Sequence, residues 1–145
     1  MLLIKNKRAS FDYDIREKIV AGIELTGPEV KSLRLKMASL TGSYVQIIGG
    51  QPVLLNAQIT PYRFARGDEY DPKRTRRLLL HRREVYRLQQ EVASKHYTLI
   101  PLAFITQGTH IKVEVGLGKG RQKYEKRAHL RQKEWEREQN TLQIR

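Results

Sequence analysis

The sequence contains no cysteine, and this absence excludes a disulfide framework and a thiolate metal site. It is compatible with a reducing cytoplasm, which is the location that we predict. No apolar run approaches the roughly 20 residues that a membrane-spanning helix needs. Met1 to Ile4 is also far too short for the hydrophobic core of a signal peptide, so we expect the protein to stay where it is made.

A convergent catalytic or metal-binding set is also missing. The four histidines, at positions 81, 96, 110 and 129, have no spacing typical of a zinc or acid–base site. Asp68, Glu69 and Asp71 could hold a magnesium ion through water, but Asp71 before Pro72 is more typical of a turn. We therefore predict neither an enzyme nor a metal or other cofactor.

The glycine-rich segment at residues 116–120 lacks the pattern of a nucleotide-binding loop. Gly118 and Gly120 flank Lys119, but Arg121 follows, whereas the phosphate-binding motif needs a longer spacing that ends in Lys and then Ser or Thr. The sequence therefore argues against an ATP site. It favours a flexible exit from the last predicted strand, where RNA phosphates could approach the backbone.

Acidic residues are scarce, since Asp and Glu total 15 against 28 Lys and Arg, which gives a formal net charge of +13. Each phosphate neutralised by a basic side chain releases condensed counterions, so this excess favours a polyanionic partner such as RNA. The 145 residues fit one domain of ordinary size with extensions.

Alternating and β-branched segments predict six short strands. They cover residues 11–19, 22–25, 43–48, 52–59, 97–105 and 109–117. Helical patterns cover residues 26–38 and 82–94, and a capping box of Thr26 and Glu29 opens the first of them. We therefore predict a mainly β protein with helices, a six-stranded antiparallel OB-like β-barrel with about three helices, of which one is a C-terminal tail.

The chain is predicted to divide into a basic N-terminal arm at residues 1–10, an RNA-binding barrel at 11–120 and a basic C-terminal tail at 121–145. The arm is expected to be a partly ordered strap. The tail has too few apolar residues for a packed face, so we expect it to be disordered when free and to fold as a helix on binding.

One group of basic residues stands directly before an apolar step. The run Arg74-Thr75-Arg76-Arg77 precedes three leucines at positions 78–80, where packing would hold the guanidinium groups still for phosphate contact. A bare basic run is more often a solvated surface, but this continuation makes the segment a candidate for RNA contact.

A second group combines basic and aromatic side chains. Lys31 and Arg34, three residues apart, would share one face of the first predicted helix. Tyr13 and Tyr44 could offer rings for base stacking, although each tyrosine alone is more typical of a core position.

Seven segments share, in order and approximate spacing, the pattern of a known family. They are Asn6-Lys7-Arg8-Ala9; Gly27 with Glu29-Val30-Lys31-Ser32-Leu33-Arg34; Ser43-Tyr44; Asp71-Pro72 with Arg74-Thr75-Arg76; Leu78-Leu79-Leu80; Tyr97-Thr98 with Pro101-Leu102; and Lys119-Gly120 with Lys126-Arg127. Together they resemble the signature segments of the SsrA-binding protein (SmpB) family, and the resemblance runs nearly from end to end.

The resemblance implies an oligonucleotide-binding-type barrel that binds the tRNA-like domain of transfer-messenger RNA (tmRNA). It further implies delivery of this RNA to stalled ribosomes for trans-translation, with the tail in the decoding region of the small subunit and the message channel. Elongation factor Tu and alanyl-tRNA synthetase would be indirect partners through the RNA. No membrane partner is implied, and we expect a monomer.

The candidate site residues are of two kinds. For RNA binding they are Asn6, Lys7, Arg8, Tyr13, Lys31, Arg34, Arg74, Arg76 and Leu79. For the ribosome-binding tail the resemblance implies Lys119, Gly120, Tyr124, Lys126, Arg127 and Trp135.

Three positions depart from the family pattern. Val20 stands where relatives often carry an acidic residue implicated in RNA contact, so that role is not transferred to it. Glu125 replaces the usual aspartate. His96 stands where glycine is common, and a left-handed helix end would cost a non-glycine residue more.

Two other classes of protein remain as alternatives. A ribosomal or ribosome-assembly protein would show the same charge and the same kind of tail. An RNA-processing enzyme would need a convergent acid–base or metal site, and this reading is the least favoured.

Overall fold

The computed structural model describes residues 1–64, 69–121 and 123–144 of the chain. Within these ranges there are nine strands and four helices. The strands are β1 (Leu2–Lys5), β2 (Tyr13–Ile23), β3 (Ala38–Ser39), β4 (Tyr44–Ile48), β5 (Gln51–Leu55), β6 (Gln58–Ile59), β7 (Arg76–Leu79), β8 (Thr98–Gln107) and β9 (His110–Gly120). The helices are α1 (Ala9–Asp12), α2 (Gly27–Arg34), α3 (Arg82–Lys95) and α4 (Lys123–Ile144).

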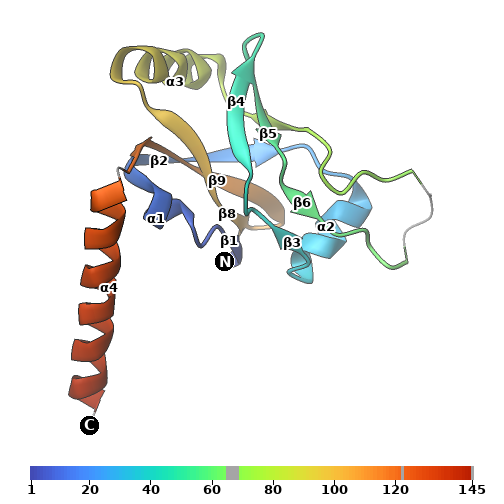
Figure 1. The fold of residues 1–145 in the computed structure, drawn as a ribbon. Helices are drawn as coiled ribbons and strands as arrows, with labels where there is room; N and C mark the ends of the chain where they lie inside the picture. The colour runs from blue at the N-terminus through green and yellow to red at the C-terminus, as the bar shows by residue number, and fades with distance from the viewer. Residues whose placement is uncertain (65–68, 122, 145) are drawn as a thin grey trace.

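Seven of these strands form one sheet in the order β1-β8-β9-β2-β7-β5-β4, and β3 pairs with β6 in a separate small sheet. Neighbouring strands pair antiparallel throughout, and β4 also approaches β8 across the molecule (Figure 1). The mainly β fold with a large antiparallel sheet is therefore confirmed. The predicted six-stranded barrel with about three helices is wrong, because the described residues form a seven-stranded sheet, a two-stranded sheet and four helices.

The three strands β1, β3 and β7 were not predicted from the sequence, and two other boundaries differ without changing the number of strands. The predicted strands at 11–19 and 22–25 are one strand, β2, because Ala21 and Gly22 continue its pairing with β9. The predicted strand at 52–59 divides into β5 and β6 at Asn56, whose φ of 63° breaks the extended backbone.

The first residues belong to the sheet as well. Leu2–Lys5 forms β1, which pairs with β8, and Leu3 is buried in the core. The expectation of a partly ordered strap is therefore wrong for these four residues, because Leu3 supplies the apolar anchor that a strand at the edge of the sheet needs.

One apolar core joins the sheet to α2 and α3. Leu33 of α2 and Leu88 of α3 pack in the same buried cluster as Phe104 of β8 and Val113 of β9. Glu29 and Thr26 form the predicted capping box at the start of α2, with Thr26 N donating to Glu29 Oε1 at 2.9 Å.

Turn residues act as the sequence predicts in both hairpins, and the helix end at His96 keeps the left-handed turn although no glycine is present. Gly49 and Gly50, with φ angles of 58° and 77°, form the turn between β4 and β5. Gly108, with a φ of 60°, lies in the turn between β8 and β9. His96 ends α3 in the left-handed region at φ 56° and ψ 35°, as expected from the glycine that is common there.

The glycines at the end of β9 permit close packing. A Cβ on Gly118 would overlap the backbone carbonyl oxygen of Asp14 in β2, and one on Gly116 would lie 2.9 Å from the Leu102 side chain. The predicted flexible exit is therefore wrong, because β9 continues through Gly120 and its glycines let β2 and β8 approach it closely.

Candidate nucleic-acid interface

The strand β7 carries the basic run that the sequence singles out, and its residues alternate between core and surface. Arg76 and Leu78 are buried, whereas Arg77 and Leu79 are exposed. The side chain of Arg76 is 0% exposed and that of Arg77 is 60% exposed. Successive side chains of a strand point to opposite faces, so Arg77 and Leu79 share the outer face.

Arg76 lies in a closed hydrogen-bond network. Its Nε donates to Glu29 Oε2 at 2.7 Å, and its Nη1 donates to the carbonyl oxygens of Ala57 and Arg74. Its Nη2 donates to the Tyr70 hydroxyl and to the Pro72 carbonyl oxygen. Its donors are used inside the protein and its side chain does not reach the surface, so the structure gives Arg76 a structural role, and its contact with RNA stays a prediction.

Glu29 is the centre of this network. Burial alone would raise the pKa of its carboxyl, but hydrogen bonds from Arg74, from the backbone N–H of Thr26 and from Arg76 lower the pKa to about 2. The carboxyl of Glu29 therefore stays ionised and holds α2 against the segment that precedes β7. Burial and the neighbouring Glu29 raise the pKa of Tyr70, whose hydroxyl lies 3.0 Å from Glu29 Oε2.

Arg74 is held by the same carboxylate. Its Nε and Nη2 both donate to Glu29, in a two-pronged pair, and its side chain is 33% exposed. The guanidinium is thus fixed as expected, but by Glu29 rather than by the leucines that follow it. Contact of Arg74 with RNA stays a prediction.

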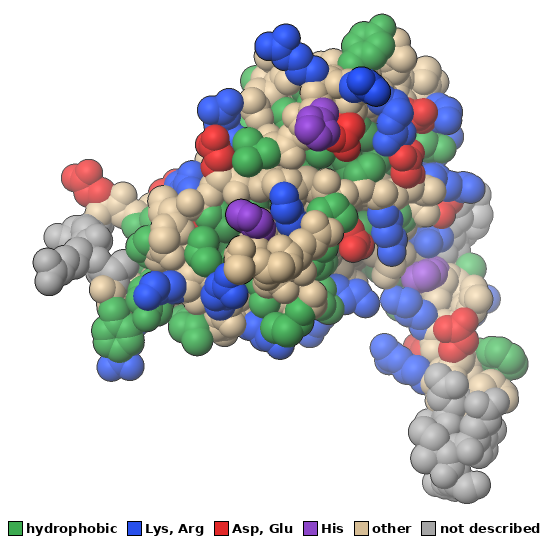
Figure 2. Space-filling view, turned by 180° about the vertical axis from the view of Figure 1, so that it is seen from behind, with side chains coloured by type: hydrophobic (Ala, Val, Ile, Leu, Met, Phe, Trp, Pro, Cys, Tyr) green, Lys and Arg blue, Asp and Glu red, His purple; other side chains and the backbone are tan. Residues whose placement is uncertain are grey.

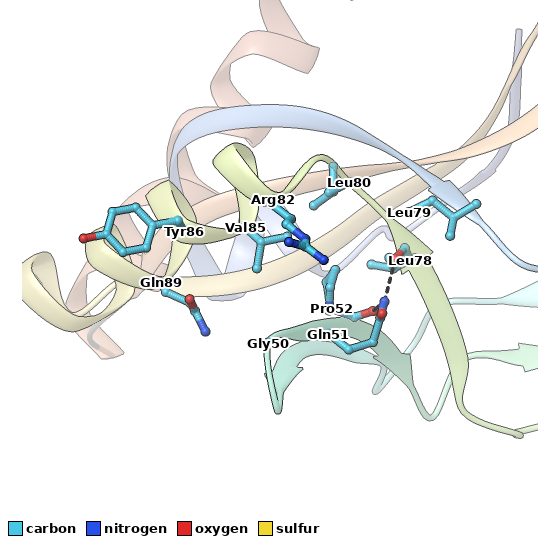
Figure 3. Close-up of a pocket in the computed structure, with 10 residues that line it drawn as sticks. All are labelled: Gly50, Gln51, Pro52, Leu78, Leu79, Leu80, Arg82, Val85, Tyr86 and Gln89. Carbon is cyan, nitrogen blue, oxygen red and sulfur yellow. Dashed lines mark hydrogen bonds between the residues drawn. The ribbon is translucent and has the colours of Figure 1, made fainter.

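Leu79 lines an open pocket of about 470 Å³ between the β4–β5 hairpin, the end of β7 and the start of α3 (Figure 3). Gln51 ties this region together, because its Nε2 donates to the Leu78 carbonyl oxygen at 2.9 Å and its Oε1 accepts from Arg77. Arg82 lies between the helix and the hairpin. Apolar side chains such as Leu79 line this pocket, and the guanidinium of Arg82 lies at its edge. Such a pocket suits a nucleotide, because the base could pack on the apolar side chains while the phosphate pairs with the guanidinium.

The basic residues of α2 lie at the surface, and their contact with RNA stays a prediction. Lys31 and Arg34 are both exposed. Arg34 Nη2 donates to the Thr109 carbonyl oxygen at 3.1 Å, which links α2 to the β8–β9 turn, and Lys31 Nζ lies 5.6 Å from the centre of the Tyr62 ring.

The N-terminal candidates have different environments. Asn6 is buried, and its Nδ2 donates to the Pro101 carbonyl oxygen at 2.9 Å. The amide holds the start of the chain to β8, where Pro101 lies at a bulge, and contact of Asn6 with RNA stays a prediction. Lys7 and Arg8 are exposed, and Tyr13 packs against a small cluster that includes Leu102, as the core alternative predicts.

The first part of the tail contacts α1, and α4 then extends away from the body of the protein (Figure 1). Arg121 N donates to the Asp12 carbonyl oxygen at 2.7 Å. Lys126 Nζ lies 3.4 Å from Asp12 Oδ1, and Lys133 Nζ donates to Ser10 Oγ at 3.3 Å. The short helix α1 is therefore the docking point of α4.

The tail candidates lie at the end of β9 and along α4. Lys119 and Gly120 are exposed at the end of the strand, and Lys119 Nζ lies 5.9 Å from the Tyr97 ring. Arg127 is exposed on α4, and Trp135 is 61% exposed. Tyr124 lies in α4, but its side chain is outside the described part of the chain.

Basic side chains are spread over the face shown in Figure 2, with acidic ones between them. Asp68, one of the three acidic residues considered for magnesium, is outside the described residues. Residues 1–64, 69–121 and 123–144 contain no group of three or more His, Cys, Asp or Glu that could hold a metal ion. The same residues include no helix long and apolar enough to cross a membrane.

Sequence reasoning placed Arg77 in the predicted basic run without distinguishing its face from that of Arg76, and it missed Arg82 and Lys112 as surface cations near Leu79. The signal was available for Arg77, because a period of two across residues 76–79 puts it on the face of Leu79 and not on that of Arg76. Lys112 is brought there by the sheet, since Gly22 of β2 lies between it and Leu79.

The fold and the site define a class of protein: a basic antiparallel β protein with an exposed cationic surface and a charged C-terminal helix, suited to RNA. A family model described as SmpB protein matches residues 3–144. The chain belongs to this family.

Relatives and a solved structure agree with this assignment. The SsrA-binding protein of Chlorobaculum tepidum is 46% identical over 140 residues, which cover 96% of this chain and 89% of the relative. The SsrA-binding protein of Chlorobium luteolum is 49% identical over 135 residues, covering 92% and 86%. A chain in a structure described as "tmRNA-SmpB: a journey to the center of the bacterial ribosome" has a TM-score of 0.68 and 40% identity, covering 85% of this chain and 87% of that chain.

Proposed function

We propose that this protein binds the tRNA-like domain of tmRNA and brings it to stalled ribosomes for trans-translation. One observation carries the proposal: a basic protein of the SmpB family presents a 22-residue charged helix, α4, that extends from its body (Figure 1). Such a helix fits an RNA-lined channel better than a flat surface. The net charge of +13 provides the electrostatic attraction that RNA binding requires.

The body and the tail take different parts of the task. The outer face of β7, with Arg77 and Leu79, and the exposed cations of α2 would contact the tRNA-like domain. Lys126, Arg127 and Trp135 of α4 would occupy the decoding region and the message channel. Elongation factor Tu and alanyl-tRNA synthetase would then act on the bound RNA without touching this chain.

The test is to sequence the RNA that co-purifies with the tagged full-length protein from cells. One dominant tmRNA species is the expected result. Enrichment of ribosomal RNA fragments without tmRNA would instead support the alternative of a ribosomal or ribosome-assembly protein. A matched purification of the Arg77→Ala variant should recover less tmRNA, because that side chain lies on the proposed binding face.

A further inference from the structure

Two aromatic rings stand at the surface on the segment between β6 and β7. The ring centres of Tyr62 and Phe64 lie 5.6 Å apart with an angle of 69° between the ring planes, an edge-to-face arrangement. The side chain of Phe64 is 74% exposed. Most of the surface of the Phe64 side chain is therefore open to a flat ligand.

Cations accompany both rings. Lys31 Nζ lies 5.6 Å from the centre of the Tyr62 ring, and the guanidinium carbon of Arg63 lies 5.6 Å from the centre of the Phe64 ring. Both basic residues are exposed. A base stacked on either ring would therefore have a cation close enough to meet its phosphate.

The segment that carries the rings is fixed at its base. Thr60 N donates to the Met37 carbonyl oxygen at 3.0 Å, and Ser32 Oγ donates to the Thr60 carbonyl oxygen at 2.7 Å. On the other side, Ile59 N donates to the Pro72 carbonyl oxygen, close to the buried Glu29 network. The segment that carries the aromatic pair is thus anchored to α2. Part of the conformational entropy of this segment is therefore lost on folding, and less has to be lost when a ligand binds.

This site is distant from the tail. The β6–β7 segment and α4 extend from opposite sides of the protein (Figure 1). From behind, hydrophobic side chains stand beside basic ones next to the grey segment of residues 65–68 (Figure 2). A ligand bound at the rings would therefore contact a part of the protein far from α4.

We propose that Tyr62 and Phe64, with Lys31 and Arg63, form a stacking site for unpaired bases of RNA. Exposed aromatic faces with interleaved cations match single-stranded RNA, because every base has a π-face and every nucleotide carries a phosphate. A protein partner would use the same rings as apolar surface, without a need for aromatic faces. The proposal rests on the proposed function only in that the ligand is RNA.

The test uses the full-length protein and a fluorescein-labelled oligouridylate as the probe, with affinity measured by fluorescence anisotropy. Phe64→Ala and Phe64→Leu should both weaken binding by about fivefold to 100-fold, because each removes one base–aromatic stack. Phe64→Trp should bind at least as tightly as the wild type, since it enlarges the ring. A 4-thiouridine oligonucleotide should also crosslink to the peptide that contains residue 62 or 64.

Ile48→Ala is the matched control, because Ile48 is an exposed apolar residue on the β4–β5 hairpin. It should bind the oligouridylate like the wild type. Unchanged binding in Phe64→Ala, or full binding in Phe64→Leu, would overturn the stacking site, the second result pointing to simple apolar contact. Affinity of the wild type for the tRNA-like domain is measured beside these variants, and its absence would overturn the proposed function instead.

Discussion

Arg76 and Arg77 are adjacent in the sequence, but the fold gives them different roles. Arg76 is enclosed and shares Glu29 with Arg74, whereas Arg77 bonds Gln51 and lies 3.8 Å from Glu24 at the surface. A buried cation and an exposed one contribute differently to the free energy of unfolding. Removal of the buried cation leaves the carboxylate of Glu29 less well compensated in the interior.

We predict that Arg76→Ala lowers the free energy of unfolding by about 3–5 kcal/mol, since Glu29 would lose a buried partner. Arg77→Ala should change the free energy of unfolding by less than about 0.5 kcal/mol. It should weaken binding of the tRNA-like domain and reduce the log–log salt slope by about one or less. Urea unfolding and RNA titrations at several salt concentrations measure both effects. Equal stability of the two variants would contradict the assignment of Arg76 to the interior and Arg77 to the surface.

Glu29 also predicts how stability depends on pH. Its pKa is about 2 in the folded protein against an ordinary value of 4.5, so the unfolded chain binds the proton more readily between these values. The resulting stabilisation, on the order of 3 kcal/mol, is fully present above about pH 4.5 and is lost as the pH falls toward 2. Urea unfolding between pH 7 and pH 2 measures it.

The matched variant is Glu29→Gln, which retains the size of the side chain but not its charge. It should be less stable at pH 7 and should show a flatter dependence between pH 4.5 and pH 2. A variant with the same acid dependence as the wild type would place the responsible carboxyl elsewhere.

At the scale of elements, α3 ends with a strained residue. His96 adopts φ 56°, a region that costs a non-glycine residue about 1–2 kcal/mol. We predict that His96→Gly raises the free energy of unfolding by about 0.5–1 kcal/mol, the gain being reduced by the greater freedom of glycine in the unfolded chain. His96→Ala, which keeps a Cβ, should give no such gain. Thermal unfolding of the wild type and both variants measures these changes in stability. If His96→Ala were also more stable than the wild type, backbone strain at His96 would be excluded as the cause of the gain.

The helix α4 is the second element with a testable role. Ala128 is exposed within it, and proline there would remove a backbone donor and cost about 3 kcal/mol in a helix. We predict that Ala128→Pro binds tmRNA normally but fails to rescue stalled ribosomes, whereas Ala128→Ser retains rescue. A cell-free trans-translation assay and circular dichroism measure function and helicity. Full rescue by the proline variant would mean that the tail works as an extended basic strap.

At the scale of the whole molecule, the described residues join the tail to the body through polar contacts with Ser10 and Asp12 of α1. Arg121 bonds the carbonyl oxygens of Asp12 and Ser10, and the following ion pair of Lys126 with Asp12 lies at a partly exposed site. Exposed ion pairs contribute about 0–1 kcal/mol each. The body should therefore be stable without α4, provided that Arg121 is kept.

We predict that a chain ending at Arg121 unfolds within a few degrees of the full-length protein, retains most affinity for the tRNA-like domain and loses ribosome rescue. Calorimetry, RNA titration and the trans-translation assay test the three parts. A large fall in the unfolding temperature would mean that α4 belongs to the core, and the division into body and tail would then be abandoned.

Local patterns in the sequence were sufficient for several features. The capping box of Thr26 and Glu29 and the Gly49–Gly50 hairpin each depend on residues close together in the chain. The charge of +13 and the family pattern depend on residue identity alone. These features could be predicted because no distant partner decides them.

The tertiary structure alone decided which polar residues are available to RNA. Asn6 meets Pro101 across 95 positions, and Arg76 meets Glu29 across 47, so their burial depends on strand pairing that no local pattern shows. The residue type of Arg76 predicts a phosphate contact, whereas the carboxylate that packing brings beside it makes it structural. The need for glycine at position 118 also follows only from the tertiary structure, because the backbone of Asp14 lies where a side chain on residue 118 would be.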